Sequence, residues 1–225
     1  MNHCFSVLTT GAARLPNRLL QGGAIAIVAL LLVPLPGLAH HPMGGRVPST
    51  SLEGFWSGLA HPVIGIDHLA FVVAVGLLAA VSTWGIAIPA AFVLAAMVGT
   101  GLHLAAMTLP AVELVIAGSV LGVGVLLARR NRAQSAVVAG LVTLAGLFHG
   151  FAYGEAILGA QAVPLIAYLA GFTLVQMAIA AAAFLVGRQL TQRRHAFSMR
   201  RVGLVICGIG ATFLATALLE AMLPV

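Results

Sequence analysis

The sequence predicts an all-α, polytopic membrane helix bundle with six transmembrane helices after a cleavable N-terminal signal peptide. Hydrophobic residues make up 61% of the 225 positions, and charged residues only 7%. A soluble domain carries about 25% charged residues to cover its surface. The mean hydropathy is +1.10, and the apolar residues gather in long runs separated by short polar segments. Most of the protein surface is therefore expected to face lipid.

Six apolar runs follow one another after residue 59. Periodicity does not separate helix from strand in runs this apolar, but length does. A membrane helix needs roughly 20 residues, and a barrel strand about half as many. We therefore expect a transmembrane domain over residues 60–225 in which each run forms one helix. The runs lie near 60–82, 85–108, 111–128, 135–154, 163–187 and 202–223.

Residues 1–39 have the pattern of a secretory signal peptide. Arg14 and Arg18 form its positive region, residues 22–35 its apolar core, and residues 37–39 its small-x-small cleavage pattern. Cleavage after this pattern would leave residues 40–59 as a short exported segment. The alternative is an uncleaved first helix, which the prolines at the end of the apolar core oppose.

The placement of arginines predicts the orientation in the membrane. The chain has no lysine, and its arginines cluster at 129–132 and 188–201. With an exported N-terminus, both clusters fall in the cytoplasm, as the positive-inside rule requires. We expect a multi-pass protein of the bacterial inner (cytoplasmic) membrane with a periplasmic mature N-terminus. The net charge of +6 does not indicate a nucleic-acid partner, because no aromatic residues are interleaved with these arginines.

Ionisable residues gather at one level of the expected helices. Such groups are costly inside a membrane and mark ion or proton paths. Imidazoles and carboxylates without a thiolate suit divalent metals such as Ni²⁺, Co²⁺ or Zn²⁺. His61 and His68 are two turns apart and would share one face of a single helix, with Pro62 in its first turn. The outer half of the bundle would hold His61, Asp67, His68, His103, Glu113, His149 and Glu155.

Three segments resemble the signature motifs of the HupE/UreJ family. They read His-Pro-Val-Ile-Gly-Ile-Asp-His-Leu-Ala at 61–70, Pro-Ala-Val-Glu at 110–113, and Phe-His-Gly-Phe-Ala-Tyr-Gly-Glu at 148–155. The resemblance covers the whole chain, including the signal peptide and the six helices. It implies a permease for nickel, or in some members cobalt, that supplies hydrogenase or urease.

The resemblance also implies which residues bind the metal. Positions implicated in metal binding match Asp67, His68, Glu113, His149 and Glu155, with His61 flanking them. One departure stands out: the family motif has a second histidine where this chain has Tyr153, and one residue more before its glutamate. Tyrosine is a poor ligand near neutral pH because its pKa is about 10. Metal affinity or selectivity is therefore expected to differ.

The functional hypothesis is transport of a divalent cation by a protein that is not an enzyme and has no tightly bound cofactor. Its expected partners are the metal ion, the lipid bilayer, and a metallochaperone or hydrogenase or urease maturation proteins. Two alternatives remain: a non-transporting metal-binding accessory or sensor protein, and an intramembrane metalloenzyme, for which no His-Glu-x-x-His pattern is present. His40, if exposed by cleavage, could chelate an ion at the N-terminus. Gln176 and Thr173 could line a path or pack across helices.

Overall fold

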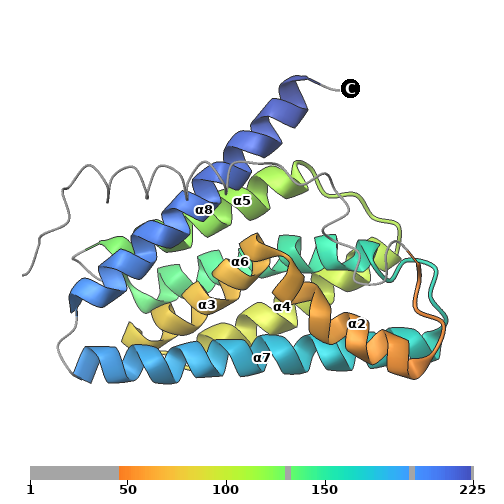
Figure 1. Cartoon of the computed structure of the whole chain (residues 1–225), viewed down its shortest axis with the longest axis horizontal. Helices are drawn as coiled ribbons and strands as arrows, with labels where there is room; N and C mark the ends of the chain where they lie inside the picture. The colour runs from red at the N-terminus through yellow and green to blue at the C-terminus, as the bar shows by residue number, and fades with distance from the viewer. Residues whose placement is uncertain (1–45, 130–132, 193–195, 224–225) are drawn as a thin grey trace, which may run out of the picture. The chain divides into compact units, whose positions relative to one another are not determined.

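The computed structural model describes residues 46–129, 133–192 and 196–223, in which the regular elements are α-helices joined by short turns and loops (Figure 1). These residues belong to one compact unit, Pro34–Val225. The all-α prediction is confirmed for them. The expected signal peptide and His40 lie outside the described residues, so cleavage and the N-terminal chelate stay predictions.

The first apolar run forms two helices instead of one. Helix α2 spans Ser51–Ile64 and helix α3 spans Ile66–Val81, and the chain bends by 81° between them. Helix α2 begins nine residues before the expected start of the run because Thr50 and Glu53 form a capping box. The Thr50 hydroxyl accepts a hydrogen bond from the Glu53 N–H, and the Glu53 carboxylate accepts one from the Thr50 N–H. The prediction of one helix over 60–82 is therefore wrong.

Pro62 and Gly65 account for the break. Pro62 lies inside α2, near its end, where it cannot donate an intrahelical hydrogen bond and its ring crowds the preceding turn. The expected place of Pro62 in a first turn is thus also wrong. Gly65 follows in an extended conformation, with φ −74° and ψ 105°, and separates the helices. As a result His61 lies on α2 and His68 on α3, and they do not share a face of one helix.

The other five apolar runs form one helix each. They are α4 (Ala87–Leu104), α5 (Val112–Ala128), α6 (Ser135–Glu155), α7 (Ala162–Gln192) and α8 (Ala196–Met222). By length and composition α4, α6, α7 and α8 can each cross a membrane, and the bent pair α2 and α3 passes the same test together. Helix α5 is apolar but, with 17 residues, shorter than a usual span. Among the described residues, four or five candidate spans are therefore found where six were expected.

Close contacts at glycines hold neighbouring helices together. Helices α4 and α6 pack so tightly that a Cβ at Gly150 would collide with the backbone of Ala96, and one at Gly99 with the backbone of Leu147. Helices α5 and α8 run in opposite directions with a similar contact between Gly210 and Leu121. Helices α2 and α3 both pack along the long helix α7. Small residues allow such close approach between membrane helices.

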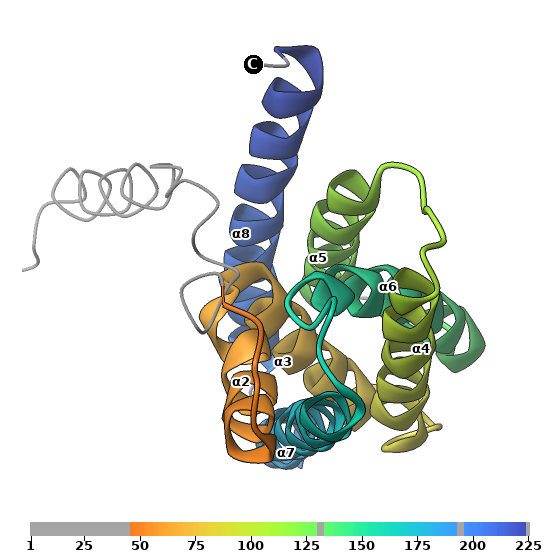
Figure 2. The same cartoon turned by 90° about the vertical axis from the view of Figure 1, so that its right-hand side faces the viewer.

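Helix α3 is the central element of this unit. It contacts α4, α5, α6, α7 and α8, and Figure 2 shows it between α7 on one side and α5 with α8 on the other. Eleven of its 16 residues are buried, including the two ionisable residues of its first turn, Asp67 and His68. A polar group at the start of α3 therefore lies in the interior of the bundle.

Charged residues separate between the two ends of the helices. One end, where α5 and α7 end and α8 begins, carries Arg129, Arg188, Arg200 and Arg201; we call it the arginine end. The opposite end, where α2 and α5 begin and α6 and α8 end, carries Glu53, Glu113, Glu155 and Glu220, together with one arginine, Arg46, shortly before α2; we call it the acidic end. This separation agrees with the level at which the sequence places its acids, while the sidedness of the membrane stays a prediction.

Candidate functional site

Two imidazoles meet in the interior of the bundle. His68 of α3 and His149 of α6 approach with their Nδ1 atoms 2.8 Å apart. Both side chains are buried, with 3% and 0% of their surface exposed. Phe71 covers the His149 ring at a centroid distance of 4.3 Å. Residues 81 positions apart in the chain thus form one buried polar contact.

A hydroxyl on a third helix determines which nitrogens carry hydrogen. Ser119 of α5 donates its only hydrogen to the Ile116 carbonyl, at 2.7 Å, and its oxygen lies 2.9 Å from His149 Nε2. His149 must therefore be the donor to Ser119 through Nε2–H. A neutral His149 then accepts at Nδ1, so His68 donates through Nδ1–H and has its lone pair on Nε2. These tautomers are assigned from the hydrogen-bond network.

The helix break makes room for this arrangement. A Cβ at Gly65 would lie 2.7 Å from Cδ2 of His68 and 3.2 Å from Oδ1 of Asp67, so a side chain there would displace the imidazole. Gly65 is not in a left-handed conformation, and space is therefore the reason for glycine at this position. Asp67 is 6% exposed and lies in the first turn of α3, where the helix dipole favours a carboxylate.

Aromatic rings enclose the imidazoles on the side of α2 and α7. The Tyr153 ring lies 5.0 Å from the His61 ring and 4.5 Å from the His68 ring, between centroids. Tyr153 is completely buried, and its ring also lies 4.6 Å from that of Phe172. Tyr168 donates a hydrogen bond to the Tyr153 carbonyl at 3.1 Å and so ties α7 to α6. The departure from the family motif therefore lies inside the site.

Two buried polar residues, His149 and Gln176, lie between two apolar clusters. On α6, His149 is one turn from Ala145 of the larger cluster and one turn from Tyr153 of the smaller one. On α7, Gln176 occupies the corresponding place between Phe172 and Ala180. Residues four apart lie on the same helix face, so both polar side chains separate the clusters. We call these two residues, together with the buried His61, Asp67 and His68 beside the helix break, the polar layer.

The remaining predicted site residues lie elsewhere. Glu113 at the start of α5 and Glu155 at the end of α6 are exposed. His103 near the end of α4 is half-buried, with its ring 4.5 Å from that of Phe151. Within 46–129, 133–192 and 196–223, no three His, Cys, Asp or Glu side chains form a group able to hold one metal ion. The structure thus brings His61, Asp67, His68 and His149 together in the interior, without Glu113 and Glu155.

Sequence reasoning missed Ser119. It is the one hydroxyl residue of α5 and lies about a turn and a half beyond Glu113. A single hydroxyl in a membrane helix is commonly satisfied by its own preceding turn. The position of Ser119 in the sequence therefore did not indicate a contact with a histidine.

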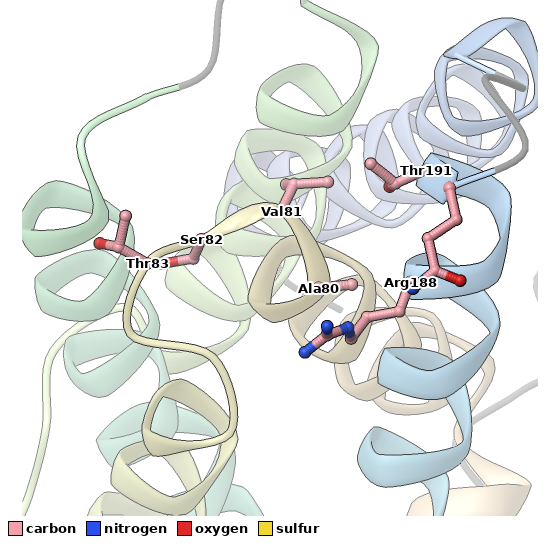
Figure 3. Close-up of a pocket in the computed structure, with 7 residues that line it drawn as sticks. Ala80, Val81, Ser82, Thr83, Arg188 and Thr191 are labelled. Carbon is pink, nitrogen blue, oxygen red and sulfur yellow. The ribbon is translucent and has the colours of Figure 1, made fainter.

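A hollow lies at the arginine end, away from the buried imidazoles (Figure 3). Its volume is about 360 Å³, and Arg188 reaches from α7 toward Ala80 at the end of α3. The rest of its lining is Val81, Ser82, Thr83, Thr191 and Gln192. A guanidinium beside hydroxyls suits an anion, so this hollow is not part of a cation site.

The fold and the site define a multi-helix membrane protein with buried imidazoles and a buried carboxylate at the break between two apolar helices. The family model described as "HupE / UreJ protein" matches residues 28–213. The chain belongs to the HupE/UreJ family. It is similar to "Protein HupE" of Rhizobium leguminosarum bv. viciae, with 34% identity over 129 residues, which cover 56% of this chain and 64% of that protein. No solved structure matches the chain.

Proposed function

We propose that this protein carries a divalent transition-metal cation across the inner membrane, nickel first and cobalt second, and so supplies the maturation of a hydrogenase or urease. Family membership supports this proposal. The observation that carries it is the buried pair of His68 and His149 beside Asp67 at the break between α2 and α3. Interrupted helices that place polar groups at membrane depth are a common construction of transport sites.

The two imidazoles have different proposed roles because their tautomers differ. His68 directs its lone pair to Nε2 and donates its other N–H to a neighbour, which is the arrangement found in metal-binding histidines. His149 uses both ring nitrogens inside the protein, one toward His68 and one toward Ser119. In this proposal His68 binds the ion directly and His149 holds the His68 ring in position.

The carboxylate supplies the charge that a cation needs to leave water. Asp67 is adjacent to His68 and buried, so its negative charge is poorly screened by solvent. Tyr153 stands where the family motif has a histidine, and a phenol is a poor metal ligand near neutral pH. One imidazole, one carboxylate and retained water molecules bind an ion less tightly than a closed cage of thiolates or histidines, as release on the far side requires.

The exposed acids have a separate role. Glu113 and Glu155 lie at the acidic end, outside the polar layer. Negative side chains at the mouth of a pathway raise the local concentration of cations. They therefore act in capture, where ionic strength weakens their effect.

Uptake of labelled nickel by vesicles containing the purified protein tests the proposal. Wild type should accumulate nickel, and Asp67→Asn and His68→Ala should abolish accumulation, because each removes a direct ligand. Glu220→Gln is the matched control, since it neutralises an exposed acid near the end of α8. Unchanged accumulation in both site variants contradicts the assignment. Stoichiometric nickel binding by wild type without accumulation supports the accessory or sensor alternative instead.

A further inference from the structure

Gln176 is a buried amide in the middle of an apolar helix. Its side chain is 0% exposed, and neither Oε1 nor Nε2 has a hydrogen-bond partner in the part of the chain that the structure describes. The surrounding helix α7 has the composition of a membrane span. Nearly all buried polar groups in proteins are paired, because an unpaired one loses its hydrogen bonds to water without replacement. A leucine or methionine would avoid this cost.

The register of α7 places Gln176 beside the helix break. Gly58 of α2 contacts α7 at Tyr168 and Phe172, and Gly76 of α3 contacts it at Ala180. Gln176 lies midway between these contacts along α7, and the break at residue 65 lies between the same contacts along α2 and α3. The amide is therefore at the level where α2 ends and α3 begins.

Two further oxygen atoms at this level share the same property. Oδ1 of Asp67 and the hydroxyl of Tyr153 are buried and have no hydrogen-bond partner within 46–129, 133–192 and 196–223. They come from α3 and α6, whereas Gln176 comes from α7. Helices α3 and α7 thus each bring one unpaired buried oxygen to the polar layer, and the Tyr153 hydroxyl of α6 lies one turn beyond His149.

We propose that Gln176 is a further contact for the transported cation, with Oε1 as an oxygen ligand to a partly hydrated divalent ion. This inference rests on the proposed function and adds a ligand on α7 to those on α3. A neutral amide attracts a cation through its dipole but adds no net charge. It therefore helps the ion exchange water for protein without holding it as a second carboxylate would.

Packing between helices is the competing role for Gln176, and stability separates the two. If the amide joins the helices through a hydrogen bond, replacing it with an apolar side chain of similar size removes that bond and lowers stability. If it serves the ion, the same change removes an unpaired polar group and leaves stability equal or higher, while metal binding weakens. Proteins commonly trade stability for function in this direction.

The test uses the full chain in lipid nanodiscs, titrated with Ni²⁺ alone. Gln176→Met and Gln176→Leu should raise the nickel dissociation constant about tenfold, with an unfolding temperature equal to or above that of wild type. Gln189→Met is the matched control, because Gln189 lies on the same helix and is exposed; it should change neither quantity. Unchanged nickel binding in both Gln176 variants, or a loss of stability in both, overturns the proposal.

Vesicle uptake with the same variants distinguishes a failure of this inference from a failure of the proposed function. If wild type binds nickel without accumulating it, while Gln176→Met binds it more weakly, transport fails and the ligand role stands. If wild type accumulates nickel and Gln176→Met does so at the same rate and affinity, the ligand role fails alone.

Discussion

Replacing Ser119 with alanine should weaken metal binding although Ser119 does not contact the ion. The Ser119 oxygen accepts the hydrogen on His149 Nε2 at 2.9 Å. Without that acceptor, His149 either keeps the hydrogen on Nε2 unpaired or moves it to Nδ1. In the second case two Nδ1–H groups face each other at 2.8 Å. The pair is then relieved only when the His68 hydrogen moves to Nε2, where it blocks the lone pair that binds metal.

The size of the effect follows from these two outcomes. Leaving a buried N–H without an acceptor costs about 1–3 kcal/mol. Loss of the group that orients a metal-binding histidine typically weakens metal affinity about 10–100-fold. Since His149 is completely buried, water does not readily replace the hydroxyl. We expect Ser119→Ala to raise the nickel dissociation constant within that range.

Calorimetric titration with Ni²⁺ measures the affinity, and ¹⁵N NMR of labelled imidazoles reports which nitrogens carry hydrogen. Ser119→Thr keeps a hydroxyl that can still bond to the preceding turn, so it should retain wild-type affinity. If the alanine variant keeps both the wild-type affinity and the wild-type ¹⁵N spectrum, the tautomer assignment is wrong. A merely structural role for Ser119 would lower stability without moving the ¹⁵N signals.

Two other substitutions test the space around His68. Gly65→Ala adds a Cβ 2.7 Å from the His68 ring and should reduce nickel uptake at least as much as Ser119→Ala. Gly140→Ala in α6 is the control, because a Cβ at Gly140 would have nothing within 4 Å. This substitution should stabilise the helix by up to about 1 kcal/mol. Equal nickel uptake in the Gly65 and Gly140 variants would contradict the steric argument. Tyr153→His restores the family's second histidine near His61 and His68 and should tighten nickel binding about tenfold while slowing its release, whereas Tyr153→Phe should leave nickel binding close to wild type. An unchanged nickel-to-cobalt preference in Tyr153→His would show that this position does not tune selectivity.

Helix positions were largely predictable because length alone identifies apolar helices. Helices α4, α5 and α6 lie within a few residues of the expected runs, and α7 and α8 extend beyond theirs toward the arginine end. The start of the first helix was predicted too late in the sequence. Its apolar stretch begins near residue 60, whereas helix α2 begins directly after its N-cap, Thr50. Thr50 followed three residues later by Glu53 is a capping-box pattern, and it was readable in the sequence.

The level of the ionisable residues was predictable, but their contacts were not. Charge and helix direction place His68 and His149 in the same half of the bundle. Their pairing depends on how α6 packs against α3 and α4, which close contacts at glycines such as Gly150 determine. Such contacts depend on side-chain geometry across helices. The sequence likewise cannot distinguish an exposed acid such as Glu155 from a buried one such as Asp67.

The break between α2 and α3 explains why the first motif combines proline, glycine, aspartate and histidine. A continuous helix through the membrane offers no end at which its backbone dipole can stabilise a charge. The break creates two such ends inside the bundle. Asp67 lies in the first turn of α3, where negative charge is favoured, and His61 in the last turn of α2, where positive charge is favoured. Pro62 and Gly65 thus allow ionisable groups at a depth where an unbroken helix would leave them unsupported.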